Sequence, residues 1–222
     1  MAKVQDIVQR IQAALRDANQ DSWPEDVIRL AIYEAEKVIV NFRPDAAPID
    51  TVYTCTTGIK QSISALTPPP NRLLSVKYNR AGDIDGRSVR RVAIGDIDAI
   101  RPTWRSQPSS TVIREFMHDD REPLVFYVSP PAASGAKLQL SYSAIPAAYP
   151  EPFNETTAVT TVSDLYEPMI IEWAMYRLFG HDVEGSVNIS RSQQHLATFQ
   201  AMMGVKIQSD AQFSVNNPDH KK

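Results

Sequence analysis

Residues 163–204 have the sequence SDLYEPMIIEWAMYRLFGHDVEGSVNISRSQQHLATFQAMMG, which predicts two helices joined by a short polar turn. Asp164 and Glu167 have the spacing of a capping box, and Gly180 is a typical helix stop. A hairpin of this kind must pack against another element. The first helix has a wide apolar surface, made by Met169, Ile170, Trp173, Ala174, Tyr176, Leu178 and Phe179. The second helix has a narrow stripe, made by Ile189, Ser192, Leu196, Phe199 and Met203.

The N-terminus carries the other strong helical pattern. Val4, Ile7, Val8, Ile11, Leu15 and Ala18 share one helical face, and Ser22 with Glu25 opens a second helix that ends at Arg43-Pro44. We expect the two hairpins to share a core with Trp173 at its centre. The residues of the second helix predicted to face inward are Val27, Ile28, Ala31, Ile32, Ala35, Val38, Ile39 and Phe42.

The sequence between the hairpins predicts an antiparallel sheet or small barrel. Asn79 to Gly86 and Ser129 to Gly135 contain turn residues, and meander connectivity is the simplest choice. Residues 94–100 fit a short helix or a turn, and we assign them as loop. The strand-like runs, rich in β-branched and aromatic residues, are TVYTCTT, NRLLSVKYN, RSVRRVA, STVIREFMH, PLVFYVSP and AKLQLSYSAI.

After Gly204 the apolar residues recur with a period of two, which is typical of a half-buried strand. This strand could pair with the β-domain of its own subunit, or fray, or extend as an arm that adds to a neighbouring protein. The residues assigned to the arm are Val205, Ile207, Ala211, Phe213 and Val215.

Composition excludes several classes of protein. The 222 residues carry a net charge of −3, so we do not expect tight binding to nucleic acid. The sequence predicts no membrane span, because no apolar run reaches about 18 residues. It predicts no secretion signal, because the N-terminus begins an amphipathic helix instead of a basic and then apolar segment. The single cysteine, Cys55, cannot form an internal disulfide, which fits a reducing cytoplasm.

Residues that could carry chemistry are few. His118-Asp119-Asp120, and His181-Asp182 with Glu184, are metal-type ligands without a second pair at ligand spacing, so solvated turns are favoured. Asp83 to Gly86 fits a hairpin turn better than a calcium loop, and Cys55 fits a packed strand residue. We therefore predict no catalytic, cofactor or metal site.

Arg87, Arg90 and Arg91 form a basic run on or beside a hairpin. A solvated strand face is the simpler interpretation, since most exposed charges contribute little. A contact with a protein partner is the alternative.

Short motifs follow one another over nearly the whole chain. In order, they are Trp23-Pro-Glu-Asp to Phe42-Arg-Pro-Asp45; Gly58-Ile-Lys-Gln-Ser-Ile63; Asn71-Arg-Leu-Leu-Ser-Val76; Gly86-Arg-Ser-Val-Arg90; Asp98 through Pro102 to Trp104; Phe126-Tyr-Val-Ser-Pro-Pro131; Tyr142-Ser-Ala-Ile-Pro146; and the terminal hairpin with Trp173-Ala174, Asp182 and Phe199. This ordered set resembles the head-to-tail adaptor (connector) proteins of tailed bacteriophages, including the tail tubular A proteins.

The resemblance implies a structural virion protein with no enzymatic activity and no cofactor. Such adaptors form homo-oligomeric rings, commonly dodecamers, between the portal and the tail nozzle or stopper. It further implies assembly in the host cytoplasm, passage of genomic DNA through the lumen without specific binding, and a C-terminal extension that reaches the portal. The alternatives are another neck component, such as a stopper or tail-completion protein, and a small metal-dependent hydrolase.

The predicted fold class is α+β: a helical bundle with an inserted antiparallel β-domain and an extended C-terminal arm. The bundle comprises residues 1–45 and 163–204, the β-domain residues 46–162, and the arm residues 205–222.

Overall fold

The chain divides into two compact units in a computed structural model. The helical unit comprises residues 1–39 and 146–222, and the β unit comprises residues 40–145. The structure describes residues 2–16, 22–82, 84–149, 153–154, 158–181 and 186–212.

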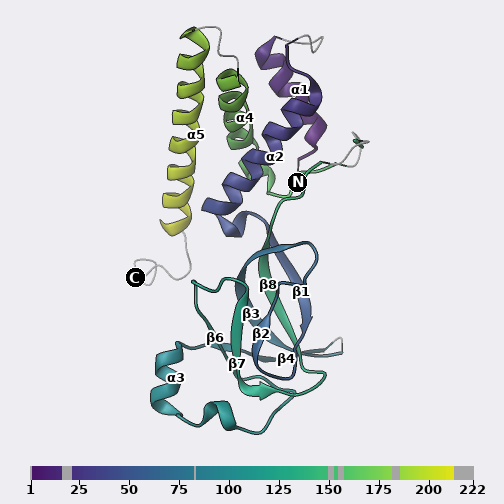
Figure 1. The fold of residues 1–222 in the computed structure, drawn as a ribbon, viewed down its shortest axis with the longest axis vertical. Helices are drawn as coiled ribbons and strands as arrows, with labels where there is room; N and C mark the ends of the chain where they lie inside the picture. The colour runs from purple at the N-terminus through teal and green to yellow at the C-terminus, as the bar shows by residue number, and fades with distance from the viewer. Residues whose placement is uncertain are drawn as a thin grey trace. The chain divides into compact units, whose positions relative to one another are not determined.

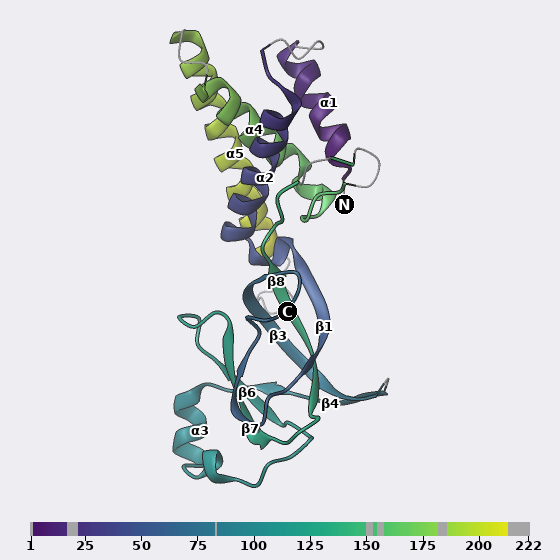
Figure 2. The same ribbon diagram turned by 45° about the vertical axis from the view of Figure 1, so that its right-hand side comes forward.

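The described part of the helical unit contains four α-helices, which run side by side, and one 3-10 helix (Figures 1 and 2). Helix α1 contacts α4, and α4 runs along α5. Two ion pairs also join N-terminal to C-terminal helices, Arg10 with Glu167 and Arg177 with Glu34. The elements are α1 (Val4–Leu15), α2 (Glu25–Phe42), η3 (Asp164–Tyr166), α4 (Glu167–His181) and α5 (Ser186–Gln212).

The residues of the apolar faces predicted from the sequence are buried or partly buried, with two exceptions, and Ala18 lies outside the described residues. Phe42, the last residue of α2, is 61% exposed, and Ile189, near the start of α5, is 52% exposed, so both inward assignments are wrong. Both residues lie in the terminal turn of their helix. Buried residues include Val4, Ile7, Val8, Ile11, Ile28, Ile32, Ala35, Met169, Ile170, Ala174, Leu178, Phe199 and Met203.

Trp173 is partly exposed and lies at the contact between α4 and α5. Its ring centroid is 5.1 Å from that of Phe199 on α5 and 5.2 Å from that of Tyr176. The fully buried side chains of α4 are instead smaller ones, such as that of Ala174. Trp173 therefore joins the C-terminal hairpin rather than centring the whole core.

A buried carboxylate fastens the segment before α4 to α2. Glu36, with no exposed surface, accepts hydrogen bonds from the Tyr149 hydroxyl and from the backbone N–H groups of Thr161 and Val162. The N-terminus adds a bridge between Lys3 and Val159. Since buried polar groups require partners, these bonds explain why the extended residues before α4 pack with the helices.

The predicted strand after Gly204 is wrong for the part of the chain that the structure describes, because α5 continues through Gln212. A glycine inside a helix costs only about 1 kcal/mol, which packing can offset. Lys206 contributes to that packing: its Nζ is 2.9 Å from Asp210 Oδ1, one turn on, and 6.0 Å from the centre of the Tyr166 ring. The period-two pattern therefore does not reflect a strand over Val205–Gln212.

The β unit contains two four-stranded sheets, in the orders β1-β8-β3-β4 and β2-β7-β6-β5. All pairs are antiparallel except the short β5–β6 pair. The strands are β1 (Pro48–Thr54), β2 (Gly58–Ser62), β3 (Pro70–Ala81), β4 (Ile84–Ser88), β5 (Arg90–Arg91), β6 (Glu115–His118), β7 (Val125–Ala132) and β8 (Lys137–Ala144), and η1 (Pro44–Ala46) precedes β1.

Meander connectivity is wrong, because β7 and β8 follow one another in sequence but lie in different sheets. The turn between them, with Gly135 at φ +82°, carries the chain from one sheet to the other. Both strands can then direct apolar residues into one core. That core contains Tyr53, Cys55, Ile63, Leu73, Val76, Val89, Ile113, Phe116, Phe126, Val128, Ala132, Ala136, Leu138, Leu140, Tyr142 and Ala144.

Two local elements of the β unit differ in how well they were predicted. The predicted β3–β4 hairpin forms, with Gly82 at φ +64° in its turn. The turn predicted for Asp83 to Gly86 is wrong at Ile84, Asp85 and Gly86, which lie in β4. Residues 94–100, assigned as loop, form helix α3 (Ile94–Ile100) and are followed by η2 (Trp104–Ser106). Burial of Ile97 and Trp104 beside Met117 stabilises this short helix, which its own periodicity could not establish.

Candidate functional site

An arginine-lined pocket of about 580 Å³ opens on the β unit. Residues from β4, β5, β6, the end of α3 and the loops after η2 and before β6 meet there. We refer to it as the arginine pocket. It is lined by Arg87, Ser88, Arg90, Arg101, Gln107, Arg114 and Glu115.

Glu115 is the single carboxylate of the arginine pocket, and its side chain is almost fully buried. Arg101 Nη2 lies 2.7 and 2.9 Å from its two oxygens, and Arg90 Nη2 lies 2.9 Å from Oε1. Burial by itself would raise the pKa of Glu115, but the hydrogen bonds from Arg101 and Arg90 outweigh it and lower the pKa. The buried anion thus stays ionised and holds two guanidinium groups in place.

Asn79 binds the backbone next to two residues of the arginine pocket. It is buried, and its Nδ2 donates to the carbonyl oxygens of Arg87 and Ile113 at 2.8 and 2.7 Å. Its Oδ1 accepts from the Ile113 N–H at 2.7 Å. One amide therefore fixes the backbone of Arg87 and the backbone immediately before Arg114.

The α3–η2 segment presents Arg101 to the arginine pocket. Trp104 is 1% exposed, and its Nε1 donates to Asp98 Oδ1 at 2.7 Å. Arg105 also donates to Asp98, and the bonds from Arg105 and Trp104 lower the pKa of that carboxyl group. The buried indole and the ionised Asp98 close the loop that carries Arg101, so its position depends on local packing.

The arginine pocket has an excess of positive charge. Its four guanidinium groups face one carboxylate, while the whole chain has a net charge of −3. Arg90 and Arg101 are paired with Glu115. Arg87 and Arg114 are exposed and have no ion-pair partner within the described ranges. The site can therefore accept further anionic groups.

The structure brings together only part of the predicted basic run. Arg87 and Arg90 line the arginine pocket, whereas the exposed Arg91 does not. Sequence reasoning missed Arg101, Arg114 and Glu115, which are distant from Arg87 along the chain. Two sequence features could have pointed to these pocket residues: the motif from Asp98 to Trp104, and the adjacent opposite charges of Arg114 and Glu115.

The residues assigned to the C-terminal arm have three different positions. Val205 and Ile207, on α5, are 66% and 42% exposed. Ala211 lies in the last turn of α5. Phe213 and Val215 fall outside the described residues.

Those residues of the metal-hydrolase alternative that the structure describes form no recognisable ligand set. His118 Nδ1 is 2.8 Å from the Val125 carbonyl oxygen, and His118 Nε2 is 3.8 Å from Asp120 Oδ1. His181 ends α4, and its neighbours Asp182 and Glu184 fall outside the described residues. Within the ranges that the structure describes, no group of three His, Cys, Asp or Glu side chains could hold a metal ion.

Cys55 is packed in the β core, as predicted. Burial raises the pKa of its thiol to about 12. Because the thiolate is the reactive form, Cys55 is an unreactive structural residue in the folded protein.

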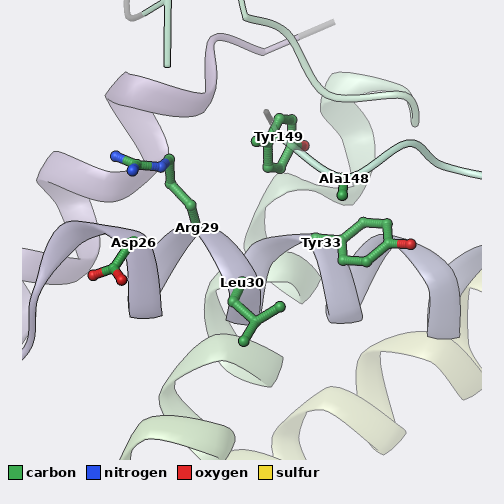
Figure 3. Close-up of a pocket in the computed structure, with 6 residues that line it drawn as sticks. All are labelled: Asp26, Arg29, Leu30, Tyr33, Ala148 and Tyr149. Atoms are coloured by element: carbon green, nitrogen blue, oxygen red, sulfur yellow. The ribbon is translucent and has the colours of Figure 1, made fainter. Parts of the chain in front are cut away.

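A smaller pocket of about 200 Å³ lies on α2 in the helical unit, where Ala148 and Tyr149 cross the helix near Arg29 and Tyr33 (Figure 3). The guanidinium carbon of Arg29 is 4.4 Å from the centre of the Phe153 ring, and its Nη1 is 2.9 Å from Glu25 Oε1. Its charged group is thus already engaged, so this pocket is a feature of packing.

Comparison with known proteins identifies the family. No helix within the described residues is long and apolar enough to cross a membrane. A comparison with curated proteins gave no match. Residues 2–219 match the family model described as SU10 adaptor protein, which confirms the predicted resemblance to phage head-to-tail adaptors. The chain therefore belongs to the SU10 adaptor protein family, whose members are structural phage proteins of the virion neck and not a family of enzymes.

Proposed function

We propose that this protein forms a homo-oligomeric ring, a dodecamer, that joins the capsid portal to the tail and gives the genomic DNA its passage during ejection. The observation that carries the proposal is the family match, which spans residues 2–219 and so includes both structural units. An adaptor acts through its surfaces. A protein that acts by binding needs no catalytic residues, and the sequence predicts no catalytic site.

Exposed apolar side chains on α5 support subunit or partner contacts in the helical unit. The helix has 27 residues and is therefore about 40 Å long. Val187, Ile189 and Val205 expose more than half of their surface along it. Burial of such side chains in an assembly would be favourable, by about 25 cal/mol for each Å² of apolar surface removed from water.

The tests of the ring are its mass and its place in the virion. Size-exclusion chromatography with light scattering, on the protein alone and mixed with its portal, is expected to show a ring that joins the portal. Cryo-electron microscopy of the virion distinguishes an adaptor from a stopper or tail-completion protein, because it shows which ring contacts the portal. A protein that joins no portal or tail component would refute the proposal.

The C-terminal end of the chain is our proposed portal contact. Val205 and Ile207 present exposed apolar surface on the last turns of α5, and Phe213 and Val215 follow. Removing residues 213–222, together with Val205→Ser and Ile207→Ser, is expected to leave the melting temperature of the monomer nearly unchanged and to abolish portal binding.

Ile100→Ser is the matched control, since Ile100 is 77% exposed but lies in α3 of the β unit. It is expected to leave portal binding unchanged. Full portal occupancy by the truncated variant, or loss of its fold, would argue against the C-terminal contact.

Passage of DNA requires a channel wall that does not bind the phosphates, because cationic side chains along the channel would hold the duplex and slow its movement. The net charge of −3 is compatible with this requirement. We expect no duplex binding at physiological salt in a gel-shift assay. A salt-sensitive shift at micromolar protein would contradict free passage.

A further inference from the structure

We propose that the arginine pocket is a binding site for the carboxylates of an acidic segment of a protein partner. The proposal assigns a ligand class to Arg87 and Arg114, which have no ion-pair partner within the described residues. Guanidinium groups bind carboxylates through charge-assisted hydrogen bonds that are stronger than neutral ones.

Two of the four guanidinium groups of the arginine pocket are held before a ligand arrives. Glu115 orients Arg90 and Arg101 through bonds of 2.7 to 2.9 Å. The Asn79 amide fixes the Arg87 backbone through its bond to the Arg87 carbonyl oxygen. A ligand that enters this site therefore orders fewer long side chains than one that binds scattered surface arginines, and loses less conformational entropy on binding.

The shape and charge of the site favour a peptide over a duplex. The four arginines converge on a concave pocket of about 580 Å³. A duplex is a stiff rod that is bound by cations spread along its backbone, and it cannot enter such a pocket. An extended acidic segment can place one or two carboxylates inside. The binding of Arg101 to the Glu115 carboxylate demonstrates the same chemistry within the protein.

Fluorescence anisotropy with fluorescein-labelled hexaglutamate and the full chain tests the proposal. We expect saturable binding that weakens as salt is raised. The double variant Arg87→Gln, Arg114→Gln removes the two unpaired guanidinium groups and is expected to weaken binding by at least about tenfold, since each charge-assisted bond contributes more than a neutral one. Both side chains are exposed, so the fold is expected to persist, which an unchanged thermal midpoint verifies.

Arg91→Gln is the matched control. Arg91 is an exposed arginine of the same short strand as Arg90 but does not line the arginine pocket. Its variant is expected to bind hexaglutamate with wild-type affinity. The same assay with a labelled duplex of equal net charge distinguishes a nucleic-acid surface from the proposed site.

Four results would overturn the proposal: no binding of hexaglutamate, wild-type affinity in the double variant, equal weakening by Arg91→Gln, or tighter binding of the duplex. The assay needs neither the portal nor a ring. Its failure would therefore leave the adaptor function, which depends on attachment to the portal, unaffected.

Discussion

Replacing Glu36 by alanine or by glutamine is expected to separate the role of its hydrogen bonds from the cost of its charge. The carboxylate has no exposed surface and accepts from the Tyr149 hydroxyl and from the backbone N–H groups of Thr161 and Val162. In Glu36→Ala, the buried Val162 amide and the Tyr149 hydroxyl lose their acceptor. Each such loss costs about 1 to 3 kcal/mol, so the free energy of unfolding should fall by about 2 to 6 kcal/mol.

Glu36→Gln should behave differently, because an amide of the same shape can still accept from Val162 and can donate to the Tyr149 oxygen. It also removes the charge. Burial raises the pKa of Glu36 above its ordinary 4.5, although the bonds from Tyr149 and the two amides oppose this shift. At neutral pH the glutamine variant is therefore expected to be at least as stable as the wild type.

The dependence on pH has a definite sign. Between pH 4.5 and the raised pKa of Glu36, the folded protein holds a proton that the unfolded chain has released. The free energy of unfolding of the wild type should therefore decrease as pH rises through this window, relative to Glu36→Gln.

Urea unfolding followed by far-UV circular dichroism, at a series of pH values, measures both effects. Equal stability of the alanine and glutamine variants would refute the hydrogen-bond argument. If the free energy of unfolding of the wild type does not fall relative to that of Glu36→Gln as pH rises, the burial argument is refuted.

Three further outcomes are expected from other sites. Trp104→Ala should reduce the free energy of unfolding of the β unit by about 3 to 5 kcal/mol, since Trp104 is almost fully buried and donates to Asp98; an unchanged urea midpoint would show that the α3–η2 segment is not packed as described. Trp173→Ala should cost less, about 1 to 3 kcal/mol in thermal or urea unfolding, because its partly exposed ring packs mainly on Phe199 and Tyr176, and a larger loss would place it in the central core. Cys55, with its thiol pKa raised to about 12, should resist a thiol reagent at pH 8 until the protein is unfolded, and rapid labelling of the native protein would contradict its burial.

Much of the helical unit could be predicted from the sequence, because helical periodicity is a local signal. The helical spacing predicts that Ile7, Ile11, Ile28 and Ile32 face inward, and all four are fully buried in the structure. The same signal failed after Gly204, where α5 continues. The alternation of apolar and polar residues in a short segment stabilises a strand less than the helix is stabilised by extending from its formed turns and by contacts such as that of Lys206 with Tyr166.

The arginine pocket and the order of the strands were decided by tertiary structure alone. Arg87, Arg101 and Arg114 are separated along the chain, and no local pattern relates them. They converge because β5 pairs with β6, because Asn79 binds the backbones of Arg87 and Ile113, and because Trp104 packs the segment that carries Arg101. Sequence periodicity reports which face of an element is buried, whereas the partner of that face depends on long-range packing.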